Sequence, residues 1–187
     1  MDHAAALVAI LSADPIRHRA LGLVSSLELP DCWIGAGFVR NAVWDHLHGR
    51  SPSCLPADAD VIWFDPAQAE SSIDHRAEAA LHALEPSISW SVKNQARMHL
   101  RNEDAPYTSA AEAMRCWPET ATAVAAHQTE DGTYEIAAPF GMDDLFTLML
   151  RSTPRFSGNK HGVYLDRVRS KRWLETWPRL RMADDYG

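Results

Sequence analysis

Long apolar runs and cysteine pairs are both missing from this sequence of 187 residues. The longest uninterrupted apolar run is Ala4–Leu11, far shorter than the ~18 residues that a membrane span requires. The start, Met1-Asp2-His3, lacks the basic residues of a signal peptide. The three cysteines are widely spaced without a Cys-x-x-Cys motif, which argues against a disulfide scaffold and a thiolate zinc site. We therefore expect a cytoplasmic protein that does not bind membranes.

Basic residues are scarce in the first part of the chain and concentrated in the last. Residues 151–187 contain nine of the 18 Lys and Arg residues with four acids, whereas residues 1–150 contain nine basic and 21 acidic residues. Such asymmetry fits either attraction to a polyanion or docking of a basic segment on an acidic body. We favour docking, because Trp173 and Trp177 in the same segment require burial. The sequence thus predicts a core over residues 1–152 and a basic helical extension over 153–187 packed on it.

Hydrophobic spacing and turn residues predict an α/β (α+β) protein with a small mixed β-sheet flanked by helices. Helices are expected at residues 4–11, 15–27, 38–48, 72–84, 110–117, from 143 or 144 to 150, and 163–176. Strands are expected at residues 33–35, 60–64, 88–92, 121–127 and 134–138, the last two joined as a hairpin by Asp131-Gly132. The strand–helix–strand order of residues 33–64 suggests a parallel pair with a right-handed crossover.

Two carboxylates at the second strand form the first candidate site. Asp58 and Asp60 are two residues apart, so on a strand they project from the same side, with Cα atoms roughly 6.5–7 Å apart. Such a pair suits Mg²⁺ (or Mn²⁺), which takes one or two carboxylates and completes its shell with water and substrate phosphates. An isolated Asp-x-Asp is also common as a solvated strand end, so the neighbouring motif matters.

A glycine turn precedes these acids. Gly35, Ala36 and Gly37 open a helix, where unpaired N–H groups and the positive end of the helix dipole favour phosphate. Arg40 follows in the first turn of that helix and is expected to reach the same phosphates. A phosphate cradle beside a metal-binding acid pair is the arrangement that a nucleoside triphosphate with Mg²⁺ requires.

The combination resembles the Gly-Gly-x-Val-Arg-Asp…Asp-x-Asp signature of the nucleotidyltransferase fold, as in the CCA-adding tRNA nucleotidyltransferases. The chain is also similar, almost end to end, to the bacterial nucleotidyltransferase-like family. The matching pieces are Ala36–Asn41, Val92–His99, Pro106-Tyr107, Trp117–Thr120 and Ala138–Phe146.

The resemblance implies metal-dependent transfer of a nucleoside monophosphate, with Asp58 and Asp60 holding the metal. It also implies nucleotide contacts from Gly35, Ala36, Gly37, Arg40, Asn41, Lys93, Asn94 and Arg97. Members of the superfamily usually carry a third carboxylate on a later strand. Here Glu119 and Glu135 are the candidates, and Glu119 is taken as catalytic.

Two positions depart from the motif: Ala36 replaces the first glycine, and Asn41 stands where the tRNA enzymes have Asp. A large helical tRNA-binding region after the core is lacking, so a small molecule or a protein is expected as acceptor ahead of RNA, and DNA is not expected. The leading hypothesis is a nucleotidyltransferase that releases pyrophosphate. The alternative is a non-catalytic nucleotide-binding or protein-interaction module with the same fold.

Overall fold

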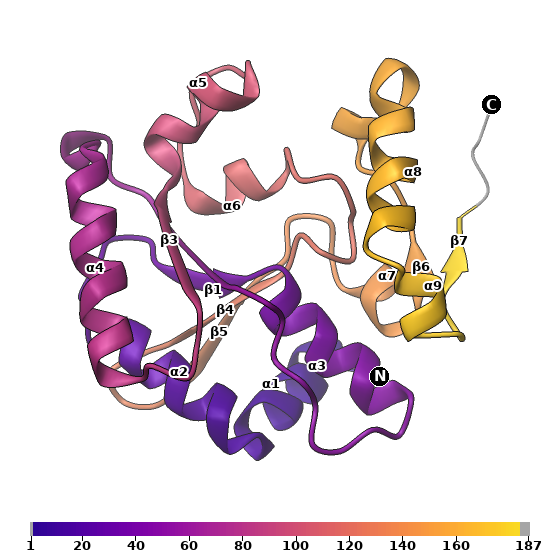
Figure 1. The fold of residues 1–187 in the computed structure, drawn as a ribbon, viewed down its shortest axis with the longest axis horizontal. Coiled ribbons are helices and arrows are strands. Elements are labelled where there is room, and N and C mark those ends of the chain that lie inside the picture. The colour runs from indigo at the N-terminus through magenta and orange to yellow at the C-terminus, as the bar shows by residue number, and fades with distance from the viewer. Residues whose placement is uncertain (1, 184–187) are drawn as a thin grey trace.

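The computed structural model describes residues 2–183, and Figure 1 shows their arrangement. The helices are α1 (His3–Ala13), α2 (Pro15–Ser25), α3 (Gly37–Leu47), α4 (Ser71–Leu84), α5 (Met98–Asn102), α6 (Ala110–Met114), α7 (Asp143–Phe146), α8 (His161–Ser170) and α9 (Trp173–Thr176). The strands are β1 (Trp33–Gly35), β2 (Ala59–Trp63), β3 (Trp90–Asn94), β4 (Ala125–Gln128), β5 (Tyr134–Ala137), β6 (Met149–Leu150) and β7 (Arg181–Met182). Short 3-10 helices lie at 66–68, 95–97, 154–156 and 158–160. None of the helices between residues 2 and 183 is long and apolar enough to cross a membrane.

A five-stranded mixed sheet in the order β3-β2-β1-β4-β5 forms the centre. Strands β2 and β3 are parallel, and the other pairs are antiparallel. The β4–β5 hairpin confirms the Asp-Gly turn prediction, with Gly132 at a φ of 83°. The mixed sheet flanked by helices also confirms the predicted fold class.

The two faces of the sheet carry different side chains, because successive residues of a strand alternate sides. Val61 and Trp63 of β2 lie in the main core with residues of α1, α2, α3 and α4. Ile62 packs in a smaller cluster with Ala110 and Met114 of α6, on the opposite face, which Asp60 shares. In Figure 1, α1 and α2 lie below the sheet while α5 and α6 lie above it.

The predicted parallel pairing of β1 and β2 is wrong, because the two strands are antiparallel and Gly35 lies opposite Asp60. An extended chain covers ~3.3 Å per residue, so residues 48–58 are enough to run back along the ~16 Å of α3. This segment returns to the start of α3: an ideal Cβ at Gly37 would lie 3.0 Å from Cβ of Pro56. Buried Arg17 fixes the return, donating from Nη2 to the carbonyl of Cys54 (2.9 Å) and from Nε to that of Phe38 (3.0 Å). Strand β2 consequently begins beside the glycine turn.

Several further predictions differ from the structure in their boundaries. The predicted strand 121–127 is shortened to β4, Ala125–Gln128, and the predicted helix 110–117 is shortened to α6, Ala110–Met114. The predicted helix ending at residue 150 is shortened to α7, because Leu148 has a φ of 58° and the chain continues as β6. The predicted helix 163–176 is broken at Arg172, whose φ is 51°, into α8 and α9. The predicted strand at 88–92 is shifted to Trp90–Asn94.

The C-terminal segment packs on the rest of the chain. Trp173 and Trp177 are buried in the main core cluster. Nε1 of Trp177 donates to Oδ1 of Asp45 at 2.7 Å, and β7 pairs with β6 across the predicted boundary at residue 152. The division into a core and an extension stays a prediction, and its residues 184–187 lie outside the described part of the chain.

Candidate active site

A cleft of about 390 Å³ lies over the sheet face that carries Asp60 and Ile62. Trp117 and Pro118 line it as well, together with residues of α5. Ala36 and Arg167 also line it, and Ala36 directly follows the residue paired with Asp60. The cleft thus brings together the glycine turn, one of the two predicted acids and a basic residue of α8.

The two acids flank Ala59, the first residue of β2, and only Asp60 lines the cleft. Asp60 is half-buried, while Asp58 is exposed just before the strand and accepts a hydrogen bond from Oγ of Ser89 at 2.9 Å. Burial raises the pKa of Asp60, and the neighbouring charge of Asp58 raises it further. Arg167, Arg40 and Lys171 oppose this rise in pKa. The acids therefore act on each other electrostatically, as the Asp-x-Asp spacing predicts.

The glycine turn has the geometry that excludes larger side chains. An ideal Cβ at Gly35 would lie 3.0 Å from Cη2 of Trp117, so a side chain there would force the indole to move. Ala36 has φ 54° and ψ −127°, which is a strained conformation for a residue with a Cβ. No side chain caps α3, so the N–H groups of its first turn lack a side-chain acceptor next to the cleft.

Arg40 is not placed in the cleft. Its guanidinium is buried, donating from Nη1 to Oγ1 of Thr122 (3.0 Å) and from Nη2 to Oδ1 of Asn41 (2.9 Å). Its Cζ lies 4.3 Å from the ring centroid of Trp173 and 5.0 Å from that of Trp44. Burial lowers the pKa of Arg40 to about 10. Arg40 and Asn41 thus join α3 to the C-terminal segment, and only Thr122 of this group lines the cleft.

Arg167 of α8 lines the cleft, whereas Arg40 does not. Its Nε donates to Oε1 of Glu119 at 2.8 Å, and none of the hydrogen bonds found among residues 2–183 uses its two Nη atoms. The Arg167 side chain is 35% exposed, whereas that of Glu119 is fully buried. The only signal for Arg167 in the sequence is the concentration of basic residues after position 150.

Neither candidate for a third carboxylate lines the cleft. Glu119 is fully buried against Arg167, and its Oε2 has no hydrogen-bond partner among residues 2–183. Glu135 is exposed on β5, three strands away from Asp60 in the sheet order. Strands lie ≈ 4.8 Å apart, so this separation is roughly 14 Å, too far for Glu135 to share a metal with Asp60.

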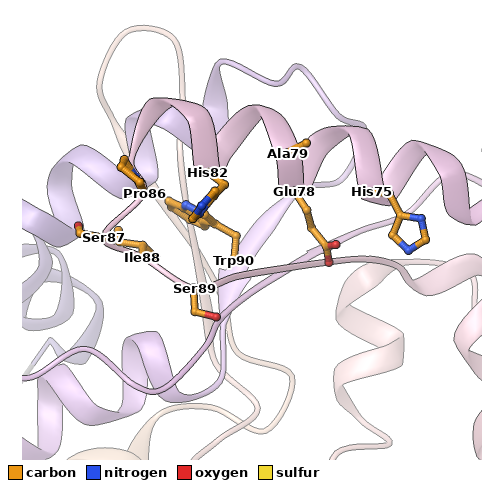
Figure 2. A pocket seen from close by; sticks show the side chains of 9 residues that line it. All are labelled: His75, Glu78, Ala79, His82, Pro86, Ser87, Ile88, Ser89 and Trp90. Carbon is orange, nitrogen blue, oxygen red and sulfur yellow. The ribbon is translucent and has the colours of Figure 1, made fainter.

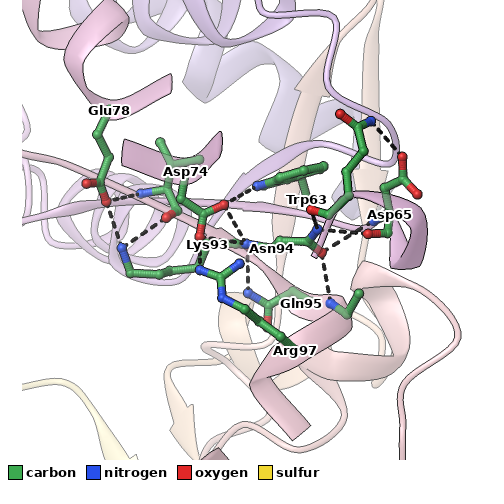
Figure 3. A network of polar contacts seen from close by, with 11 residues as sticks. Trp63, Asp65, Asp74, Glu78, Lys93, Asn94, Gln95 and Arg97 are labelled. Atoms are coloured by element: carbon green, nitrogen blue, oxygen red, sulfur yellow. Dashed lines mark hydrogen bonds and ion pairs between the residues drawn. The ribbon is translucent and has the colours of Figure 1, made fainter. Parts of the chain in front are cut away.

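Asn94 lies outside the cleft, in the polar network of Figure 3. It is fully buried, and Nδ2 donates to the carbonyls of Asp65 (2.8 Å) and Gln68 (2.9 Å). Its Oδ1 accepts from the backbone N of Ala96 at 2.9 Å. These contacts hold the end of β3 against the turn after β2, which is a structural role.

Arg97 and Lys93 belong to the same network (Figure 3). Arg97 forms an ion pair with buried Asp74, which also accepts from Nε1 of Trp63 at 2.8 Å. Nζ of Lys93 pairs with Glu78 of α4 at 2.7 Å, yet Lys93 also lines the cleft. Of the three residues predicted after the third strand, only Lys93 therefore lines the cleft.

A second, more open groove runs along α4 and is shown in Figure 2. His75 and His82 lie on its helix side as exposed residues, and Trp90 closes its other side. Ser89, which binds Asp58, lines the same groove. The two histidines therefore face solvent.

The donors at the start of β2 fit a magnesium ion that binds together with a nucleotide. Among residues 2–183, no three His, Cys, Asp or Glu side chains are placed to hold a metal together. Mg²⁺ binds through one or two carboxylates when substrate phosphates and water complete its octahedron. Asp58 and Asp60 supply this minimal set, and Ala36, the residue that precedes α3, lines the cleft together with Asp60.

Fold and cleft together define the class: an α/β nucleotidyltransferase-type domain with an acid pair beside a glycine turn. A family model described as Nucleotidyltransferase matches residues 22–182. This chain belongs to that nucleotidyltransferase family. No match is found among curated proteins.

Solved structures of CCA-adding enzymes share the fold. An NMR structure described as revealing a CCA-adding enzyme head domain is 34% identical, with a TM-score of 0.80 over 94% of this chain and 95% of that one. The Thermotoga maritima CCA-adding enzyme complexed with tRNA is 14% identical, with a TM-score of 0.62 over 95% of this chain and 42% of that one. The Bacillus stearothermophilus enzyme in complex with CTP is 17% identical, with a TM-score of 0.56 over 91% of this chain and 42% of that one. The chain thus spans about two fifths of these two longer enzymes.

Proposed function

We propose that this protein is a metal-dependent nucleotidyltransferase that moves a nucleoside monophosphate from a nucleoside triphosphate to an acceptor and releases pyrophosphate. The observation that carries the proposal is the convergence of Asp60, Ala36 and Arg167 on one cleft. Family membership supports nucleotidyl transfer in general. The CTP bound to the Bacillus stearothermophilus enzyme supports a nucleoside triphosphate as substrate.

Asp58 and Asp60 would hold the magnesium ion, which when bound supplies charge neutralisation at the phosphates. The first-turn amides of α3, with Ala36 and Gly37, would bind the triphosphate at a helix N-terminus. Catalysis of phosphoryl transfer depends mainly on such positioning and on electrostatic stabilisation.

Arg167 takes the role of the phosphate-binding cation in this proposal. Arg167 lines the cleft together with Asp60, while Glu119 holds its Nε. A guanidinium fixed through one nitrogen can present the remaining N–H groups to phosphate oxygens as a fork. Glu119 accordingly serves to position Arg167 and is not needed as a third metal ligand.

The test is nucleotide binding followed by transfer. Titration calorimetry with each nucleoside triphosphate, with and without Mg²⁺ or Mn²⁺, measures metal-dependent binding. We expect Asp58→Asn and Asp60→Asn to lose the metal-dependent part. Glu135→Gln changes an exposed carboxylate on the same sheet face and should leave binding unchanged.

Transfer is then followed with α-phosphate-labelled nucleotide and a pyrophosphate assay, offered small hydroxylated molecules, proteins and RNA as acceptors. A small molecule or a protein is the acceptor that we expect first. Label transfer with pyrophosphate release supports the enzyme. Metal-dependent binding without transfer to any acceptor favours the alternative, a nucleotide-binding module, and unchanged binding in both Asp variants contradicts the site itself.

A further inference from the structure

Seven tryptophans are present, and they divide by burial. Four are buried in the main core: Trp44, Trp63, Trp173 and Trp177. The other three, Trp33, Trp90 and Trp117, are half-buried and each shows part of its ring to solvent. A half-buried indole offers a flat apolar face, which is the surface on which nucleobases stack.

Two of the three half-buried tryptophans are engaged elsewhere. Nε1 of Trp33 donates to Oδ1 of Asp31 at 2.6 Å, and the ring packs edge-on against His127. Nε1 of Trp90 donates to the carbonyl of Glu85 at 3.1 Å, and the ring lines the groove of α4 (Figure 2). Trp117 differs from both: it lines the cleft, and no hydrogen bond among residues 2–183 involves its Nε1.

The register of the sheet gives the direction in which a nucleotide would lie. Asp60 pairs with Ser91 in the parallel β2–β3 ladder, and Ser91, Lys93 and Gln95 all line the cleft. At ~3.3 Å per residue, Gln95 lies roughly 13 Å beyond Ser91. A triphosphate held beside Asp60 therefore directs its nucleoside along β3, towards α5.

Trp117 flanks this path. The Cη2 edge of its indole lies against Gly35, the strand partner of Asp60, and it packs on the cluster that contains Ile62. Met98 of α5 lines the same cleft, so an apolar surface is available next to the path. Arg101 and Asn102 of α5 add polar groups suited to the edge of a base.

We infer that Trp117 is the stacking platform for the base of the nucleoside triphosphate bound in the cleft. The inference rests on the proposed function, because the direction of the nucleoside follows from phosphates at Asp60. It names a base-binding residue that is separate from the metal and phosphate contacts. Stacking accepts any base, so Trp117 contributes affinity for nucleotides in general and leaves base choice to the polar groups of α5.

The experiment compares two probes on the full chain: nucleoside triphosphates, and inorganic tripolyphosphate, which has the charges but no base. Trp117→Leu keeps an apolar side chain against Gly35 and removes the aromatic face. It should weaken Mg²⁺-dependent nucleoside triphosphate binding by about 5- to 150-fold and leave tripolyphosphate binding within about 2-fold. Trp90→Leu, the matched control in the groove of α4, should change neither affinity.

A second measurement follows the unmodified chain and uses a variant only to assign a signal. Fluorine NMR of the chain labelled with 5-fluorotryptophan gives one resonance for each tryptophan, and loss of a peak in Trp117→Phe identifies that of Trp117. Saturating nucleoside triphosphate with Mg²⁺ should shift this resonance, and tripolyphosphate should shift it much less.

Three results would overturn the inference. The first is equal weakening for both probes in Trp117→Leu, which would make Trp117 a support of the cleft only. The second is equal affinity of the unmodified chain for both probes, or a Trp117 resonance that does not shift. Either outcome would contradict the stacking role of Trp117 and leave the proposed function intact. The third is binding of neither probe by the unmodified chain, which would remove the proposed function and the platform together.

Discussion

The ion pair between Arg167 and Glu119 leads to a prediction whose size follows from burial. Glu119 is fully buried and receives its hydrogen bond from Nε of Arg167 at 2.8 Å. Removing one partner of a buried pair costs about 3–5 kcal/mol, because the other charge is left uncompensated. Arg167 is 35% exposed, and the charge of nearby Arg40 also acts on Glu119. We therefore expect Arg167→Met to lower the free energy of unfolding by about 2–3 kcal/mol.

A double-mutant cycle separates this pair from other effects of the substitutions. Glu119→Gln should cost about 1–2 kcal/mol, because Arg167 keeps access to water when its partner is neutral. The double variant should be less destabilised than the sum of the two, with a coupling of about 1–2 kcal/mol. Urea unfolding at pH 7 measures all four proteins. For a chain of this size, the Arg167→Met value corresponds to a fall in Tm of about 4–12 °C.

The same helix supplies the control. Arg169 pairs with Asp166 in an ion pair whose side chains are 71% and 78% exposed. Arg169→Met should change the free energy of unfolding by less than about 1 kcal/mol. Additive effects of Arg167→Met and Glu119→Gln would refute the reasoning, because they would mean that the two side chains do not depend on each other.

Three further predictions concern the acids, the C-terminal segment and the turn. Because burial and Asp58 raise the pKa of Asp60, its neutral form is favoured in the folded state, and stability is lost as the pH rises through that pKa. At pH 8, urea unfolding of Asp60→Asn should therefore give a free energy of unfolding about 0.5–2 kcal/mol higher than that of the unmodified chain, and this difference should shrink towards pH 4. Trp177→Phe removes the N–H that binds Asp45 but keeps a ring in the core, so thermal unfolding should show a loss of about 1–3 kcal/mol; no change would contradict the hydrogen bond. Ala36→Gly relieves a strain of about 1–3 kcal/mol against an entropic cost of up to about 1 kcal/mol, so urea unfolding should show a net gain of roughly 0–3 kcal/mol, and a loss would show that Ala36 is unstrained.

Local patterns in the sequence predicted the parts of the site that are close together along the chain. The turn at Gly35–Gly37 and the acids at 58 and 60 were found because glycine placement and period-2 spacing report local backbone geometry. Helix α2 followed in the same way from its cap and apolar spacing, with Asp14 capping α2 by accepting hydrogen bonds from the backbone N–H groups of Ile16 and Arg17.

The other parts of the fold and of the site depend on which face of a helix or strand is covered by a segment that is distant in the sequence. The location of Arg40 in the first turn of α3 does not determine whether its side chain faces a ligand or Trp173, which lies far along the chain. The segment between α3 and β2 is long enough for either strand direction, so its length did not decide how β1 pairs. Arg167 was missed because its place in the cleft follows from the packing of α8 and has no counterpart in local spacing.

The distance along the chain between Asp60 and Arg167 has a consequence for synthesis. At about 5–20 residues per second, the ribosome adds Arg167 roughly 5–20 s after Asp60. In the later part of that interval, after Glu119 has been added, the nascent chain carries Glu119 without its counter-charge. If Arg167 binds phosphate as proposed, a chain truncated before α8 would gain no stability from added nucleoside triphosphate, whereas a chain that includes α8 would.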